Sequence, residues 1–180
     1  MGHIFKLFLT LNSLSLSLMV FFIKEGIVLN SLHPYLSNLP NIISYVVYFL
    51  MIVMFTKLSM LLIHFLDTDT IEAGSISTIE PANDAFLPSY LGYFFVALSV
   101  PNIEVFLCIF GIIGIFVFSS RISYFNPIFF LFGYHFYSVV NNKNIKVLII
   151  TRKRLKEPKR ASFQEIKRIN DYTFIDMEGR

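Results

Sequence analysis

The chain has 180 residues, of which 55% are hydrophobic and only 15% are charged. Soluble domains carry about 25% charged residues, so this composition excludes an ordinary soluble globule and predicts a small integral membrane protein. The charge is uneven: residues 119–180 hold 12 basic and 5 acidic residues, a net charge of +7, whereas the preceding residues hold 3 and 7, a net charge of −4. Because basic residues mark the cytoplasmic side, we expect the carboxyl-terminal part inside the cell.

The first apolar segment, residues 7–23, has 17 residues without a charge, which is the lower limit for a membrane-spanning helix. A cleaved signal peptide is the alternative, but no cleavage site of small residues follows, and we expect a retained span. Asn12, Ser13, Ser15 and Ser17 lie within this segment. Small polar side chains of this kind let another helix approach closely and share hydrogen bonds.

A second span is predicted over residues 42–66, and it contains Lys57 and His64. Lys57 lies about 22 Å along the helix from its start, within reach of the inner surface if the side chain snorkels, which favours an interfacial anchor. Alternatively, Lys57 and His64 share one helix face, because they are seven residues apart, and line a polar seam inside a bundle or an oligomer. The following segment, residues 67–85, is acidic and rich in Ser and Thr, and predicts a solvated cytoplasmic loop that could dock on a basic tail.

The apolar run from residue 86 to residue 120 is too long for one span, since a single helix would be about 50 Å long against a hydrocarbon core of roughly 30 Å. Pro101-Asn102 interrupts it, and proline breaks helices. We therefore predict two spans, 86–100 and 103–120. The transmembrane region, residues 1–120, is expected to be an all-α bundle of four transmembrane helices, with both termini cytoplasmic.

Residues 121–180 change to a β-type pattern after Asn126-Pro127. Two β-prone stretches flank the turn-forming residues 141–144, which is typical of a hairpin. The predicted strands are 129–140, 145–151, 163–168 and 172–177. They predict a small cytoplasmic antiparallel sheet of three or four strands in a basic, β-rich domain.

The segment between these strands is strongly basic, and its charge and Pro158 exclude a central strand. Attraction to anionic lipid headgroups is one role, worth about 1 kcal/mol per basic residue near the surface. Docking of a partner protein is another, and direct nucleic-acid binding is the least favoured because no reading motif accompanies the charge. The candidate partner- or lipid-binding residues are Arg152, Lys153, Arg154, Lys156, Lys159 and Arg160.

No pattern in the sequence points to catalysis. The four histidines are scattered over different segments, and Cys108 is the single cysteine, so no metal-ligand spacing exists. Glycine-rich phosphate loops and nucleophile elbows are also missing. We expect neither a cofactor nor enzymatic activity.

Four segments together resemble the KwaA family, the membrane component of the Kiwa anti-phage defence system of bacteria. They are Ile79–Ala82 (IEPA), Phe86–Leu98 (FLPSYLGYFFVAL), Phe125-Asn126-Pro127 with the FLFGYHFY that follows, and Leu148–Lys153 (LIITRK). The resemblance implies a four-span inner-membrane protein that assembles as a homo-oligomer, a tetramer, and binds the cytoplasmic DNA-binding effector KwaB. It also implies that the spans sense phage attack and pass the signal inward.

The leading hypothesis is therefore a non-enzymatic sensor and scaffold in the bacterial inner membrane. Its basic segment recruits a KwaB-like effector, and its spans shift between two packings. The alternative is a small oligomeric channel or depolarising pore lined by Lys57, His64 and the serines of the first span.

Overall fold

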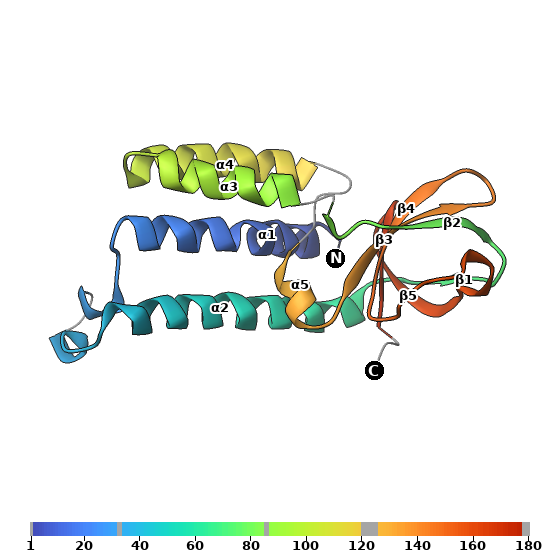
Figure 1. Ribbon diagram of the computed structural model, residues 1–180, viewed down its shortest axis with the longest axis horizontal. Helices are drawn as coiled ribbons and strands as arrows, with labels where there is room; N and C mark the ends of the chain where they lie inside the picture. The colour runs from blue at the N-terminus through green and yellow to red at the C-terminus, as the bar shows by residue number, and fades with distance from the viewer. Residues whose placement is uncertain (1, 32–33, 85–86, 120–125, 178–180) are drawn as a thin grey trace.

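A computed structural model of the chain describes residues 2–31, 34–84, 87–119 and 126–177, without the side chains of residues 2–4, 31, 34 and 159. The molecule is elongated, with four helices side by side at one end and a β-sheet at the other (Figure 1). The helices and the sheet thus lie at opposite ends of the molecule.

The four apolar segments each form a helix: α1 (Gly2–Lys24), α2 (Asn41–Leu62), α3 (Leu87–Ser99) and α4 (Ile103–Ser119). With the 3₁₀ turn η3 (Ile63–Phe65), α2 is long and apolar enough to cross a membrane, and so is α1. The helices α3 and α4 are apolar but have only 13 and 17 residues, fewer than the roughly 20 of a typical span. Residues 86 and 120, the outer ends of the two predicted spans, lie outside the described residues.

The predicted break between α3 and α4 is confirmed. Asn102 begins α4 by accepting a hydrogen bond from the Val105 N–H on its side-chain oxygen, at 3.0 Å. The ammonium of Lys24, at the end of α1, donates to the Val100 carbonyl in this turn. The connection from α1 to α2 contains two 3₁₀ turns, η1 (Leu29–Ser31) and η2 (Pro34–Leu36).

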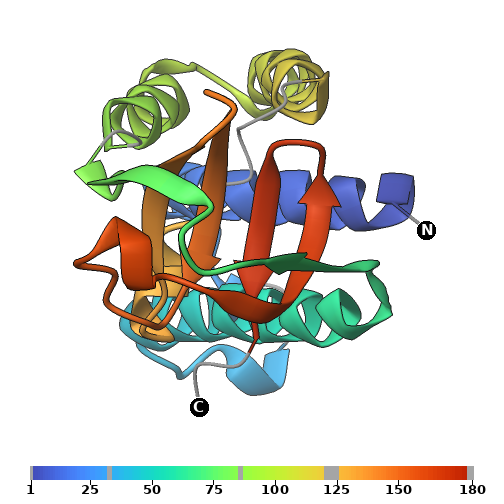
Figure 2. The same cartoon turned by 90° about the vertical axis from the view of Figure 1, so that its right-hand side faces the viewer.

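The helix α1 lies between α2 and the α3–α4 pair (Figures 1 and 2). Its far end is held by Phe21, whose ring stacks on Phe106 of α4 with 4.1 Å between ring centroids. Ala97 of α3 is fully buried beside them, and its small side chain permits this close packing. The helices α1 and α2 are inclined to α3 and α4 in the view along the molecule (Figure 2).

The sheet has six strands in the order β1-β5-β6-β4-β3-β2. All neighbours are antiparallel except β4 and β6, which pair in parallel. The predicted hairpin with its turn after Asn141 is confirmed, as are strands at the two later positions. The bounds are β1 (Thr68–Ile71), β2 (Ile76–Pro81), β3 (His135–Asn141), β4 (Lys146–Thr151), β5 (Phe163–Asn170) and β6 (Thr173–Asp176).

Two features of the predicted sheet are wrong. The observed sheet is mixed rather than purely antiparallel, because the chain crosses from β4 to β5 and then places β6 beside β4, parallel to it. It is also larger, because the segment predicted as a solvated loop supplies the edge strands β1 and β2. β1 alternates between exposed and partly buried residues, whereas β2 is largely exposed and is anchored by Ile76, which packs into the core.

Phe129 was predicted to begin a strand, but it lies in the short helix α5 (Ile128–Leu131). Asn126 explains the difference, because its side-chain oxygen accepts the Ile128 N–H at 2.9 Å and starts a helical turn. Gly133, with φ +77°, ends this turn and releases the chain into β3.

The core is continuous from the helix ends into the sheet. Phe5 of α1 and Ile63 of η3 belong to the same buried cluster as Phe129, Phe136 and Ile175. A second cluster covers the opposite face of the sheet and includes Ile149, Ile166 and Phe174. The sheet therefore packs directly on the helices.

Candidate partner surface and helix–sheet junction

A buried polar network joins the helices where they meet the sheet. The Thr56 hydroxyl lies 2.8 Å from the Asn12 side-chain oxygen and can donate to it. The Asn12 amide donates to the Ser59 hydroxyl at 3.3 Å, and the Asn126 amide donates to Thr56 Oγ1 at 3.0 Å. All four residues are at most 1% exposed. Buried polar groups need such partners, so the network fixes one packing of α1 against α2.

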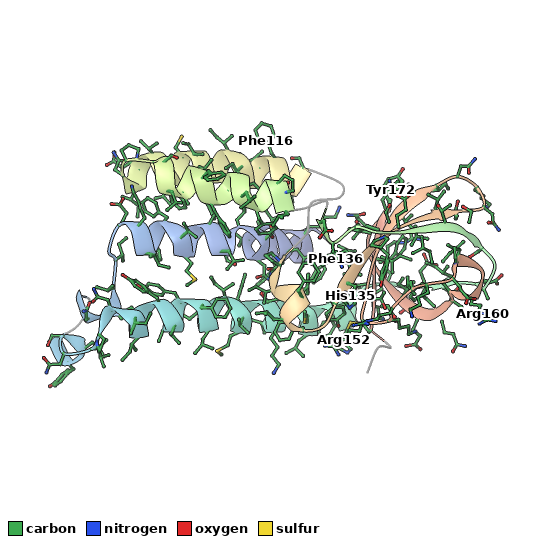
Figure 3. All side chains as sticks on the ribbon, in the orientation of Figure 1. Phe116, His135, Phe136, Arg152, Arg160 and Tyr172 are labelled. Carbon is green, nitrogen blue, oxygen red and sulfur yellow. The ribbon has the colours of Figure 1, made fainter. Side chains whose placement is uncertain are left out.

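Asn126 extends this network to the sheet. The same side chain that donates to Thr56 starts α5, and Phe129 of α5 is buried against Tyr134 and Phe136. A movement of α2 that displaces Thr56 therefore also acts on Asn126, at the start of the segment that leads into β3. Figure 3 shows Phe136 at this boundary between helices and sheet.

The predicted role of the polar residues in the first helix is confirmed for Asn12 by its bonds to α2. The hydroxyls of Ser13, Ser15 and Ser17 donate instead to carbonyl oxygens three residues earlier in α1. The Tyr90 hydroxyl of α3 donates to the Ser13 carbonyl at 3.3 Å, so a neighbouring helix does approach here.

Sequence reasoning missed Thr56, Ser59 and Asn126. Thr56 and Ser59 are three residues apart and share one face of an otherwise apolar helix, a pattern that indicates a polar contact with a neighbour. The partner from the carboxyl-terminal part could not be read from local pattern, because 70 residues separate Asn126 from Thr56.

Lys57 and His64 are both exposed on the outer surface. The structure therefore does not bring them into the interior of this chain's own bundle. The physical reason is that α2 turns Thr56 and Ser59 inward, which directs Lys57 outward. A seam between copies of the chain stays a prediction. The His64 ring lies 3.3 Å from the Leu61 carbonyl of its own helix.

The basic segment begins with two anchored residues. The Arg152 guanidinium stacks over the Tyr134 ring at 4.6 Å, and the Lys153 ammonium lies 3.5 Å from the Asp176 carboxylate and 5.4 Å from the Phe163 ring centroid. Thr151 donates to the same Asp176 carboxylate at 2.7 Å. Arg152 and Lys153 thus hold the segment on the sheet.

Arg154, Lys156 and Arg160 are exposed around a hollow of about 290 Å³. Glu157 also lines it and pairs with Arg160 at 3.1 Å, which leaves the hollow predominantly basic. The side chain of Lys159, the remaining predicted residue, lies outside the described side chains. Lys153 lines the hollow as well, so the structure brings four of the predicted residues together there.

This segment runs away from the helices. Arg152 lies at the end of the sheet nearer to α5, whereas Arg160 lies at the far end (Figure 3). The strand register agrees, because Phe163, three residues after Arg160, pairs with Ile71 at the end of β1 remote from α2. A flat membrane surface at the helix ends cannot contact the whole segment at once.

An ion pair fixes the edge strand β1 to β5. The Arg168 guanidinium donates to the Asp69 carboxylate at 2.6 Å, and this hydrogen bond lowers the pKa of Asp69 below its ordinary value while raising the pKa of Arg168. The acidic segment thus docks on the basic part of the same chain, with its ion pair at Arg168.

Among residues 2–31, 34–84, 87–119 and 126–177, no group of three or more His, Cys, Asp or Glu residues could hold a metal ion.

One comparison with known proteins gives a match. The family model described as anti-phage protein KwaA matches residues 5–175, which includes the helices, the junction and the sheet. Neither the curated proteins nor the solved structures contain a match to the chain. Because the match covers nearly the whole length, the resemblance inferred from the sequence is confirmed, and the chain belongs to the KwaA family of anti-phage proteins.

Proposed function

We propose that this chain is a non-enzymatic sensor and scaffold of anti-phage defence in the bacterial inner membrane, with α1 to α4 all crossing the bilayer and both termini in the cytoplasm. Only 28% of the apolar stretch of α2 is buried, and Phe95 and Phe116 of the shorter helices are exposed. Such apolar surface requires an apolar surrounding. The bilayer thins locally to accommodate the short helices α3 and α4.

The spans act as the sensor by shifting between two packings, of which the partner prefers one. The network of Asn12, Thr56, Ser59 and Asn126 supports this role, because it connects the helices to the segment that leads into the sheet. A perturbation that separates α1 from α2 breaks these hydrogen bonds and releases Asn126. The sheet then presents its partner surface differently.

The scaffold function rests on one observation, which is that the basic segment runs from the helix side of the sheet to its far end. If the helices lie in the membrane, Arg160 points into the cytoplasm, and the hollow around Arg154, Lys156 and Arg160 faces a soluble partner rather than lipid. We assign this surface to a cytoplasmic DNA-binding effector of the KwaB type, which would bring acidic side chains to it. Lipid headgroups reach only the beginning of the segment.

Charge reversal tests this assignment. The double variant Arg154→Glu with Lys156→Glu should abolish co-purification of the effector with membranes that contain the chain, because both side chains are exposed at the hollow. Arg152 is left unchanged, since it packs on Tyr134 and its loss would disturb the fold.

The matched control is Lys143→Glu with Lys146→Glu, at exposed positions of the β3–β4 hairpin, which makes the same change in net charge. It should leave co-purification intact. If both double variants lose co-purification equally, the interaction depends on overall charge rather than on this surface. If Arg154→Glu with Lys156→Glu retains full co-purification, the assigned surface is contradicted.

Several copies of the chain assemble as a homo-oligomer, which the resemblance implies to be a tetramer. The channel alternative needs the serines of α1 to face a lumen, but Ser13 and Ser17 are buried and donate to their own helix. Conductance of the purified protein in planar bilayers, compared with Lys57→Leu, separates the two functions. A silent bilayer supports the scaffold.

A further inference from the structure

An apolar groove opens on the outer surface between α1, α2 and α4. Its volume is about 740 Å³, within the roughly 300–1,000 Å³ of ligand pockets. Leu11 of α1, Met51 and Met54 of α2, and Phe110 of α4 form its walls. Among the described residues that line the groove, the polar ones are Lys57 and Ser15, whose hydroxyl is bonded to the Asn12 carbonyl. The groove is thus an apolar slot with one positive charge.

The position of Lys57 points to the headgroup layer on the sheet side. Its neighbour Thr56 bonds Asn126, which belongs to the connection that leaves the helices for the sheet. The flexible stem of a lysine allows its ammonium to reach the membrane surface from such a position. From Met51 to Leu61 the groove follows about 15 Å of helix, which is half of a hydrocarbon core of roughly 30 Å and so the depth of one leaflet.

The four helices supply no anionic partner at this depth. In the described parts of α1 to α4 the only acidic residue is Glu104, at the opposite end of the helical layer from Lys57. A second copy of the chain seated in the groove would therefore bring apolar side chains but no carboxylate for the ammonium. A phosphodiester with an acyl chain attached satisfies both the charge and the apolar walls.

We propose that this groove binds one anionic phospholipid of the inner leaflet, with an acyl chain between α1, α2 and α4 and the phosphate facing Lys57. The assignment rests on the proposed membrane-spanning function. The bound lipid would be a ligand of the sensor. The groove lies on the outer side of the same helix pair that the buried network joins, so loss or exchange of the lipid would change the packing of α1 against α2.

Tryptophan quenching tests the site, since the natural chain has no tryptophan. Met54→Trp places the fluorophore in the groove, and Phe116→Trp places it on the outer face of α4, where Phe116 points away from the bundle (Figure 3). Each full-length variant is reconstituted in phosphatidylcholine vesicles with increasing amounts of phosphatidylglycerol brominated on its acyl chains. Half-maximal quenching of Met54→Trp should need about fivefold less brominated lipid than that of Phe116→Trp, the preference expected for one lysine at an anionic lipid.

Two further variants assign the preference to Lys57. In the Met54→Trp background, Lys57→Gln should erase the fivefold difference, and Lys57→Arg should keep it. Brominated phosphatidylcholine should quench both tryptophan variants equally. Coincident curves with brominated phosphatidylglycerol would mean ordinary surrounding lipid only and would overturn the proposal.

The remaining outcomes separate this site from the proposed function. Quenching of Phe116→Trp without quenching of Met54→Trp would show that a second copy of the chain fills the groove, which overturns the lipid site and leaves the membrane function standing. If neither variant is quenched, the helices are not in the bilayer and the proposed function itself fails.

Discussion

Replacing Thr56 with valine tests the junction between helices and sheet. Valine has nearly the shape of threonine but lacks the hydroxyl on which the Asn12 and Asn126 side chains converge. Both amides are at most 1% exposed, so neither finds water when the hydroxyl is removed. We expect the helices to remain formed and the contact between α1, α2 and α5 to loosen.

The magnitude follows from the two groups that lose a partner. Each buried polar group left unsatisfied costs about 1–3 kcal/mol in soluble proteins, whereas hydrogen bonds between membrane helices average about 0.6 kcal/mol. For two groups we therefore expect Thr56→Val to lower the free energy of unfolding by about 1–6 kcal/mol. Thr10→Val is the matched control, because the Thr10 hydroxyl donates to the Lys6 carbonyl of its own helix.

The assay is unfolding of the full chain in mixed micelles by increasing dodecyl sulfate, followed by circular dichroism. Thr56→Val should unfold at a lower detergent fraction than Thr10→Val. In a separate measurement, co-purification of the effector with membranes should change in Thr56→Val and not in Thr10→Val. Equal stability of the two variants would refute the reasoning that the network holds the junction.

Two further predictions concern the sheet. Asp69→Asn should lower the melting temperature at neutral pH by removing the pair with Arg168. Because that pair lowers the pKa of Asp69, the stabilisation is present above about pH 4, the ordinary pKa of an aspartate, and disappears as the pH falls through the lowered value. The two proteins should therefore melt alike once the pH lies below the lowered pKa, and a difference that persists in acid would contradict the assignment. Gly133→Ala should cost about 1 kcal/mol in thermal unfolding because of its φ of +77°, although no atom lies within 4 Å of the added methyl. Gly133→Asn should recover part of this loss, since asparagine tolerates the conformation better.

Local patterns predicted the helices and the hairpin correctly because each depends on nearby residues. Apolar runs interrupted by Pro101 define α3 and α4, and the turn after Asn141 defines β3 and β4. The basic segment was also identified from the sequence, and the structure gathers Arg154, Lys156 and Arg160 around one hollow.

The edge strands and the buried network could not be predicted in the same way. β1 is short and polar, and it becomes a strand only because β5 offers it a register almost 100 residues later, with Thr68 opposite Lys167. The direction of Lys57 similarly depends on which face of α2 meets α1, the face on which Thr56 bonds Asn12 and Asn126. Long-range pairing of this kind leaves no trace in a local window.

The placement of β1 and β2 has a consequence for dissecting this protein. The segment between α2 and α3 supplies both edge strands of the sheet, with β1 beside β5 and β2 beside β3. A fragment beginning after α4 would lack both edge strands, so β5 and β3 would become the edges of the sheet with unpaired backbone groups. Unpaired edges of this kind promote self-association. The helical and β-rich halves are therefore interleaved in the sequence, and a truncated tail is not a faithful substitute for the whole chain.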